Sequence, residues 1–169
     1  SRAQTLEIER VWGSRTGAQR ALLGLLFAVT QEGLLVKRIR DEAPGFRIPA
    51  NEPGLIRIGD FSIQMEQVAR EEIGSLTDPD ILYVSEEETK DLVFRGREPD
   101  DYIQPFGMQG TKKMSVAMVD LKLRADHRDS WPLLSRGNEV LWIPGYQKSE
   151  KTRVGADAHY IRYHFKREE

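Results

Sequence analysis

The sequence has no cysteine, only three histidines and almost no net charge, and each shortage excludes a class of protein. Without cysteine the chain cannot form a disulfide framework, a cysteine-based zinc site or a thiol nucleophile, and a cytoplasmic location is expected. The longest apolar run, residues 21–29, is far shorter than the ~20 residues that cross a bilayer. A net charge of −2 excludes a strongly basic nucleic-acid-binding protein.

The length of 169 residues indicates one or two small domains with enough chain to bury a core. Charge is uneven along it. Residues 1–89 carry 10 basic and 15 acidic side chains, whereas residues 90–169 carry 15 basic and 12 acidic ones. An anionic partner is therefore expected at the C-terminal half.

The N-terminal third is predicted to be helical over residues 16–38. The prediction rests on a spacing of three and four residues between Leu22, Leu25, Leu26 and Val29, which should be buried on one face of a helix, with a break at Gly33. A proline-rich stretch follows, which cannot be regular helix.

A β-hairpin is predicted around the two-residue turn Gly59 and Asp60. In a hairpin of this kind Ile58 faces Phe61 and Ile56 faces Ile63, so the apolar side chains share one face. Further strands are expected at residues 81–84 and 92–94, in a second hairpin over 133–143, and at 160–165. The predicted class is α+β, with a helical and hairpin region at 1–76 and a compact β-rich domain with one main amphipathic helix at 77–169.

The stretch GMQGTKK at residues 107–113 leads into that helix. Met114, Ala117, Met118 and Leu121 follow at helical spacing, and Thr111 is the predicted N-cap, which places Lys112 and Lys113 in the first turn. Cations there oppose the helix dipole, so the two lysines either bind an anion together with the free backbone N–H groups or are simply solvated.

Other basic side chains flank this segment and form the candidate nucleic-acid site. Guanidinium groups two residues apart on a strand can meet successive phosphates, and several such contacts make binding salt-dependent. The candidate phosphate-binding residues are Arg95, Arg97, Lys112, Lys113, Lys122, Arg124, Arg128, Lys148, Lys151 and Arg153.

No residues with the spacing of a catalytic centre are found. His159 and His164 are an odd number of residues apart on a predicted strand, so they point to opposite faces and cannot share a metal. Asp100 and Asp101 are predicted to form salt bridges with the neighbouring arginines, and Trp142 is predicted to lie in the core.

Three stretches of the C-terminal half resemble the C-terminal domain of bacterial tRNA(Ile)-lysidine synthases. That family shows Arg-x-Arg-x-x-Gly-Asp-Arg, then Pro-Phe/Leu-Gly-Met-x-Gly-x-Lys-Lys before an amphipathic helix, then Trp-Val-x-Gly-x-Arg-x-Ser/Asp-Glu. The resemblance covers roughly residues 80–157. The matching positions are Arg95, Arg97, Asp101, Pro105, Phe106, Gly107, Met108, Gly110, Lys112, Lys113, Trp142, Gly145 and Glu150.

Three positions depart from the family pattern. Asp100 replaces a glycine, Tyr102 replaces an arginine, and Gln147 replaces a common arginine. The resemblance therefore implies an altered turn and one phosphate contact fewer.

The resemblance implies a tRNA-binding role at the acceptor-stem end. In the family, a separate N-terminal domain uses ATP to join lysine to the wobble cytidine, and its Ser-Gly-Gly-x-Asp-Ser loop is absent from these 169 residues. The chain is therefore expected to hold no catalytic residue, metal or cofactor of its own, and to partner tRNA and the catalytic domain, whether linked or separate. The alternatives are a protein-interaction or oligomerisation module without RNA contact, built on the apolar 21–29 segment, and an enzyme domain that binds a small anion or a nucleotide, built on residues 107–113.

Overall fold

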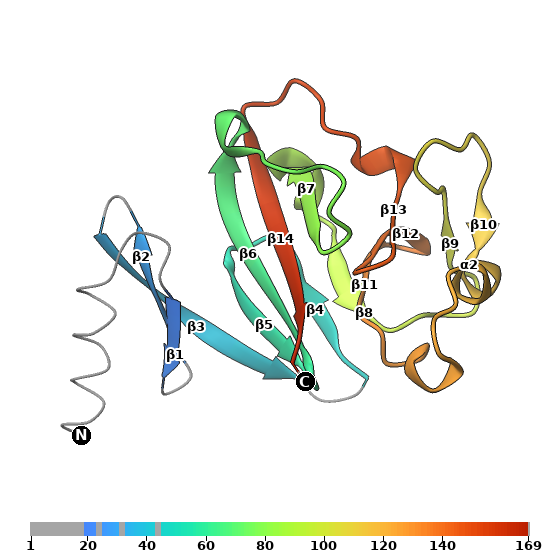
Figure 1. Cartoon of the computed structure of the whole chain (residues 1–169), viewed down its shortest axis with the longest axis horizontal. Helices are drawn as coiled ribbons and strands as arrows, with labels where there is room; N and C mark the ends of the chain where they lie inside the picture. Colours follow the sequence, from blue (N-terminus) through green and yellow to red (C-terminus); the bar gives the residue numbers. More distant parts are fainter. Residues whose placement is uncertain (1–18, 23–24, 31–32, 43–44, 169) are drawn as a thin grey trace.

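The computed structural model describes residues 19–22, 25–30, 33–42 and 45–168 of the chain (Figure 1). Within these ranges the chain is mostly β-sheet with one α-helix, as the predicted β-rich class requires. The α-helix is α2 (Met114–Asp120). The strands are β1 (Gln19–Leu22), β2 (Leu25–Thr30), β3 (Gly33–Glu42), β4 (Arg47–Pro49), β5 (Gly54–Ile58), β6 (Phe61–Ala69), β7 (Ile81–Ser85), β8 (Val93–Arg95), β9 (Tyr102–Ile103), β10 (Lys112–Lys113), β11 (Leu133–Arg136), β12 (Glu139–Ile143), β13 (Gln147–Lys148) and β14 (His159–Arg167).

The first sheet has the order β1-β2-β3-β5-β6-β14-β7. Its β5–β6 hairpin has the predicted register, with Ile58 opposite Phe61 and Ile56 opposite Ile63. All four side chains are buried. Gly59 takes a φ of +56°, a left-handed conformation that suits glycine and matches the twist of a two-residue hairpin turn. The predicted hairpin is confirmed.

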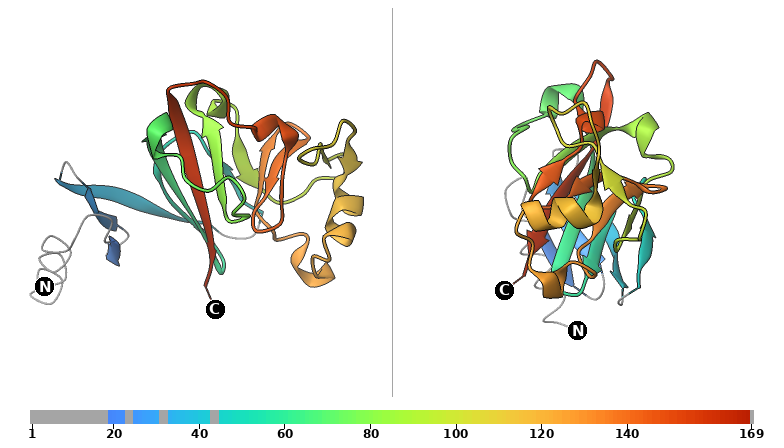
Figure 2. Two further views of the ribbon diagram at one scale, coloured as in Figure 1. Left: turned by 45° about the horizontal axis from the view of Figure 1, so that its top comes forward. Right: turned by 90° about the vertical axis from the view of Figure 1, so that its right-hand side faces the viewer.

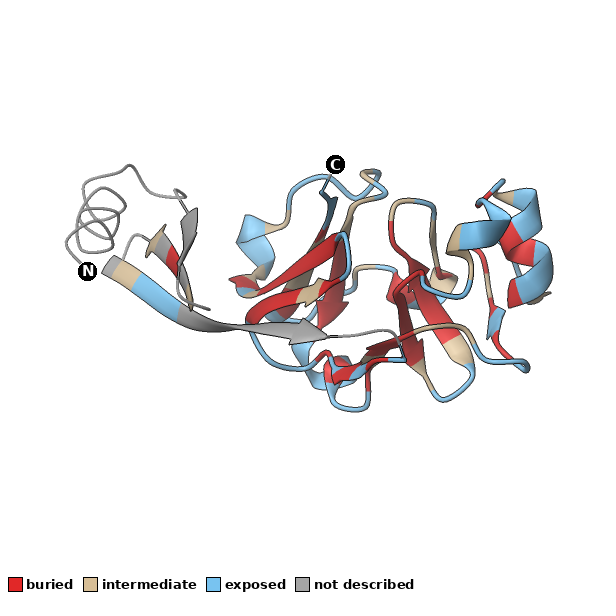
Figure 3. Cartoon of the chain, turned by 90° about the horizontal axis from the view of Figure 1, so that it is seen from below, coloured by how far each residue is buried: buried red, intermediate tan, exposed pale blue. Residues whose placement is uncertain are grey.

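The second sheet has the order β10-β9-β12-β11-β8-β4, and β13 pairs with β12. The predicted hairpin over residues 133–143 is confirmed as β11 and β12, and the predicted strands at 81–84, 92–94 and 160–165 correspond to β7, β8 and β14. One continuous apolar core lies between the two sheets. Trp142 is fully buried there, with its ring 6.5 Å from that of Phe94 in an edge-to-face contact. Figure 3 shows the buried residues gathered in the strands of both sheets.

The predicted helix over residues 16–38 is wrong wherever the structure describes that segment. Residues 19–22, 25–30 and 33–42 form β1, β2 and β3, and Thr30 pairs with Gly33, so Gly33 begins a strand instead of ending a helix. Leu25 and Val29 are only half-buried, whereas Phe27 between them on the same face of β2 is buried. The apolar run 21–29 is compatible with the periodicity of a helix and with that of a strand, and the pairing of the strands decides between the two. The remaining residues of the predicted helix, and the side chains of Leu22 and Leu26, lie outside the described part.

Strands β1 and β2 and the start of β3 lie away from the two-sheet core (Figure 1; Figure 2). Only residues 39–42 of β3 pair with β5. The domain boundary near residue 77 stays a prediction, but contacts cross it, since β14 pairs with β6 along its whole length and with β7 on its other side. In the described residues no helix is long and apolar enough to span a membrane.

Candidate nucleic-acid interface

Arg95, the first arginine of the Arg-x-Arg pair, is buried inside the domain. Its side chain is only 3% exposed, and its guanidinium donates two hydrogen bonds to Asp101, at 2.8 and 2.7 Å. A third bond, of 2.7 Å, reaches the carbonyl oxygen of Gly137 in the β11–β12 turn. Arg95 was predicted to bind phosphate. In this position it has a structural role, because it is buried and its two terminal NH₂ groups donate to Asp101 and to the carbonyl oxygens of Gly96 and Gly137.

Asp101 is the buried counter-charge of Arg95. Burial alone would raise its pKa, but hydrogen bonds from Arg95, from the Glu98 backbone N–H and from Asn138 outweigh burial and hold the pKa below its ordinary value. The predicted salt-bridging role of Asp101 is confirmed. Sequence reasoning missed Asn138, which acts from the β11–β12 turn, and only the Gly-Asn turn signal pointed to that place in the chain.

Arg97 lies outside the strand face on which it was predicted. β8 ends at Arg95, and the Arg97 side chain, 29% exposed, donates from Nε to Asp129 at 2.8 Å. Gly96 between the two arginines packs against the chain at Asp129, where an added Cβ would lie 2.8 Å from a backbone oxygen. Arg97 therefore reaches solvent while it is tied to the segment after 3-10 helix η3 (Ala125–His127).

The predicted start of the helix is wrong by two residues. Thr111 is not its N-cap; Lys112 and Lys113 form β10, which pairs with β9, and α2 begins at Met114. The lysines therefore do not occupy a first helical turn, and the anion site built on the helix dipole does not form as predicted. The apolar face is confirmed, since Met114, Ala117 and Met118 are buried and Leu121 packs against the core.

Basic side chains surround α2 and η3. Lys113 and Lys122 are exposed and, among the described residues, form no ion pair. Lys112 pairs with Asp120 at 2.9 Å, Arg124 pairs with Asp126, and Arg128 donates to the Leu123 carbonyl oxygen. We call this set (Lys112, Lys113, Lys122, Arg124 and Arg128) the helix cations.

Lys122 has an unusual backbone conformation. It directly follows the C-cap of α2 with a φ of +59°, and it is the one non-glycine residue with positive φ in the described part of the chain. Glycine is the usual residue at this position, and an L-residue there costs about 1–2 kcal/mol. The lysine is therefore kept in a place where the fold alone would favour glycine.

The Pro-Phe-Gly-Met block lies in the loop between β9 and β10. Residues from the motif that begins at Trp142, and those directly after it, hold this loop in place. The backbone N–H of Gly107, which has a φ of +83°, donates to Glu150 at 2.7 Å. The Arg153 guanidinium lies 4.3 Å from the centre of the exposed Phe106 ring. Hydrogen bonds from Arg153 and then from Gly107 lower the pKa of the Glu150 carboxyl. The second and third motifs thus form one local structure.

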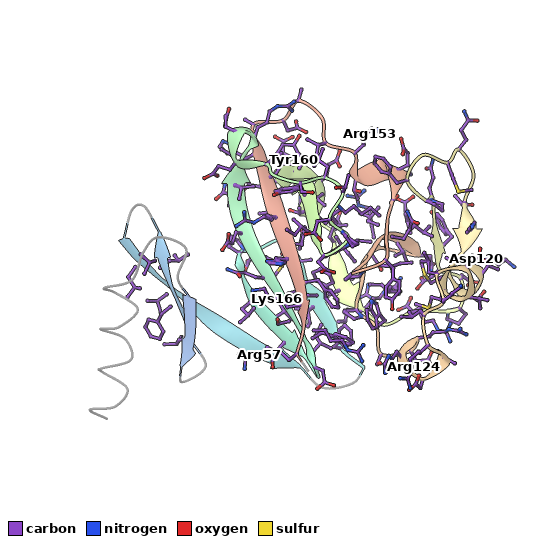
Figure 4. All side chains as sticks on the ribbon, viewed as in Figure 1. Arg57, Asp120, Arg124, Arg153, Tyr160 and Lys166 are labelled. Carbon is purple, nitrogen blue, oxygen red and sulfur yellow. The ribbon has the colours of Figure 1, made fainter. Side chains whose placement is uncertain are left out.

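The remaining predicted cations lie around this loop. Arg153 pairs with Glu150, and Lys151 pairs with Glu139 at 2.9 Å. Lys148 donates to the Leu76 carbonyl oxygen, and burial lowers its pKa. Figure 4 shows Arg153 at the end of the second sheet opposite to Arg124. The structure therefore divides the predicted site into two groups, and the helix cations include Lys113 and Lys122, which are exposed and form no ion pair among the described residues.

Aromatic and metal-ligating side chains add little to this surface. Trp131 is buried, and its indole N–H donates to the Pro144 carbonyl oxygen. Trp142 lies in the core as predicted. In the ranges that the structure describes, no three His, Asp or Glu side chains come together in a way that could hold a metal ion.

Part of the C-terminal half is similar to known proteins. Residues 92–165 match the TilS substrate C-terminal domain. The tRNA(Ile)-lysidine synthase of Caldanaerobacter subterraneus subsp. tengcongensis is 41% identical over 64 residues, 38% of this chain and 14% of that protein. That of Symbiobacterium thermophilum is 43% identical over 65 residues, again 38% and 14%. The matched segment therefore spans about a seventh of the length of these relatives.

A solved structure shares the fold. The crystal structure of a TILS C-terminal domain aligns with a TM-score of 0.58 at 23% identity, and the alignment covers 75% of this chain and 92% of that chain. The predicted resemblance to the lysidine synthase C-terminal domain is confirmed.

Proposed function

Because residues 92–165 match the TilS substrate C-terminal domain, we propose that this chain is the tRNA-binding portion of a tRNA(Ile)-lysidine synthase. In this role it holds the acceptor-stem end of the tRNA. A catalytic domain outside these 169 residues, covalently linked or separate, uses ATP to join lysine to the wobble cytidine. The proposal assigns no catalytic residue and no ATP or lysine site to this chain.

The observation that carries the proposal is the pair of exposed lysines at the two ends of α2. A helix of this length spans about 10 Å, so Lys113 and Lys122 can reach more than one phosphate of a strand. Neither is neutralised by a carboxylate among the described residues. The positive φ of Lys122 supports a functional reason for the lysine, because local strain is commonly kept where function requires it.

Recognition through phosphates suits a folded RNA. An A-form helix has a narrow major groove that hides its base edges, so proteins read its shape, its phosphates and its 2′-hydroxyls. The helix cations lie on short elements packed against the core through Met114, Ala117 and Met118, and they are therefore presented from a fixed surface. Such a surface needs little ordering on binding.

The rival function is a protein-interaction module without RNA contact. It was based on an apolar helix at residues 21–29, and the described part of that segment forms strands instead. Sedimentation of the chain measures its self-association independently of RNA binding.

The experiment that tests the acceptor-end proposal compares two RNA hairpins of equal length. One copies the acceptor stem of an isoleucine tRNA and the other its anticodon stem-loop, and fluorescence anisotropy measures the affinity of the full chain for each. We expect clearly tighter binding of the acceptor hairpin. Equal affinities would contradict acceptor-end recognition, and no binding of either hairpin or of whole tRNA at low salt would contradict RNA binding.

A further inference from the structure

A cavity of about 650 Å³ lies beside the helix cations and has no role in the function proposed above. Its lining comes from segments far apart in the sequence: residues 45–47, the β5–β6 turn at 58–61, the end of β8 and the residues after it (95–98), the end of η3 and the residues after it (127 and 129–130), and Arg167 at the end of β14. The volume falls in the range of small-ligand sites, about 300–1,000 Å³.

The wall of the cavity is aromatic and fixed. Phe46 and Phe61 line it and are each only 8% exposed. The Phe61 ring packs edge to face on Trp131, with ring centres 4.7 Å apart. The Arg167 guanidinium lies over both rings, 5.8 Å from Phe61 and 5.9 Å from Trp131. A planar cation is thus held in place by two buried rings.

The charged groups of the cavity differ in how far they are neutralised. Arg167 has no carboxylate partner among the described residues, whereas Arg97 binds Asp129 through Nε, and Arg47 is 3.6 Å from Glu98. Asp60 also lies on the rim. The lining therefore offers guanidinium groups for a phosphate, and carboxylates that can accept hydrogen bonds from amino or hydroxyl groups.

We propose that this cavity binds one unpaired nucleotide of a bound RNA strand. A flat base would stack on the Arg167 guanidinium, which is a common platform for unstacked bases, and its phosphate would lie toward Arg97. His127 of η3 lines the cavity, and two of the helix cations, Arg124 and Arg128, lie directly before and after η3 in the chain. A strand that leaves a helix bound at these cations can thus enter the cavity. The inference rests on the RNA-binding function proposed above.

The test uses two probes and a matched pair of variants. The probes are a blunt-ended RNA hairpin and the same hairpin with one unpaired 3′-terminal adenosine; adenosine 5′-monophosphate serves as a free nucleotide. The variants of the full chain are Arg167→Ala and Lys166→Ala. Lys166 precedes Arg167 on β14, carries the same charge and points to the opposite face of the strand, so it controls for charge alone.

We expect wild type and Lys166→Ala to bind the hairpin with the unpaired adenosine about tenfold more tightly than the blunt one, in line with the free energy of one base stacked on a side chain. Arg167→Ala should abolish this difference and bind both hairpins with the blunt-hairpin affinity. Equal binding of the two hairpins by wild type would overturn the cavity proposal and leave RNA binding intact. Binding of the free monophosphate without any preference for the unpaired end would assign the site to a free nucleotide and overturn it as well. Failure to bind either hairpin would instead count against the proposed function.

Discussion

Asp101 is the buried charge that joins three separate parts of the domain. Its carboxylate accepts hydrogen bonds from Arg95 at the end of β8, from the Glu98 backbone in the segment before β9, and from Asn138 in the β11–β12 turn. These donors satisfy the buried Asp101 carboxylate, which is the condition under which a buried charge is tolerated. The Arg-x-Arg motif therefore contributes one structural arginine and one that reaches solvent.

Replacing Asp101 by asparagine should destabilise the domain strongly. Asp101→Asn keeps the shape of the side chain but removes the buried counter-charge of Arg95 and leaves only the exposed Glu98, 3.7 Å from Nε; breaking a buried pair in this way costs about 3–5 kcal/mol. Urea unfolding followed by tryptophan fluorescence measures the loss. Asp100→Asn is the matched control, because Asp100 is exposed, and it should change the free energy of unfolding by less than about 0.5 kcal/mol.

The double variant Arg95→Met/Asp101→Leu distinguishes charge from packing. It removes both charges and keeps apolar volume, so it should lose less stability than Asp101→Asn. If the double variant is less stable than Asp101→Asn, the uncompensated charge of Arg95 is not the cause of the stability that Asp101→Asn loses.

Asp101 also predicts how stability depends on pH. Its pKa is lower in the folded protein than the ordinary value of about 3.9, so the ionised form favours folding. This contribution is complete above the unfolded pKa, and it disappears as the pH falls through the lower folded pKa. Between about pH 5 and pH 2 the free energy of unfolding should therefore fall, and it should fall less in the Arg95→Met/Asp101→Leu variant. Parallel acid profiles for wild type and double variant would contradict this assignment.

Neither the burial of Arg95 nor its partner in the hairpin turn could be predicted from the sequence. Arginines are rarely buried, and two of them separated by one residue suggest an exposed strand face. The Arg95 bond to the Gly137 carbonyl joins residues 42 apart in sequence and exists only after β8 and β11 have paired. The neighbouring acidic pair, Asp100 and Asp101, predicted a salt bridge but did not predict that the salt bridge is buried.

At the scale of elements, predictability follows the range of the interactions that define each element. The β5–β6 hairpin is local, since its turn and its alternating apolar residues lie within a single short stretch, and its register was predicted correctly. The segment 19–42 depends on pairing with other strands. Its apolar residues fit a helix as well as a strand, so the sequence could not decide between them.

The C-terminal end of α2 gives the element-scale prediction. Lys122→Gly should stabilise the domain by about 1 kcal/mol, because glycine adopts the positive φ without steric cost. The same variant should weaken tRNA binding, because an exposed cation is lost. Urea unfolding and anisotropy with labelled tRNA measure the two effects. Unchanged tRNA affinity in a more stable protein would mean that Lys122 is only a solvated side chain.

At the scale of the whole molecule, the two sheets share one core and present cations at both ends of the second sheet. At the end of the second sheet that carries Lys151 and Arg153, these two side chains pair with carboxylates, which reduces the positive charge available to an anion there. The composition predicted an anionic partner for the C-terminal half. It could not show which cations are neutralised, because that depends on loops brought together by folding.

The salt dependence of tRNA binding tests the central claim most directly. The affinity of the full chain for folded tRNA is measured across a series of salt concentrations for wild type, Lys113→Ala/Lys122→Ala and the charge-matched control Lys90→Ala/Lys166→Ala, whose lysines are exposed and lie outside the helix cations. Each lysine that neutralises a phosphate contributes about 0.7–0.9 to the slope of log affinity against log salt. The first variant should therefore bind more weakly, with a slope smaller by roughly one to two units, while the control keeps the wild-type slope and all three unfold at similar urea concentrations. An unchanged slope and affinity in Lys113→Ala/Lys122→Ala, with the loss appearing in the control instead, would contradict the assignment of the RNA-binding face to the helix cations.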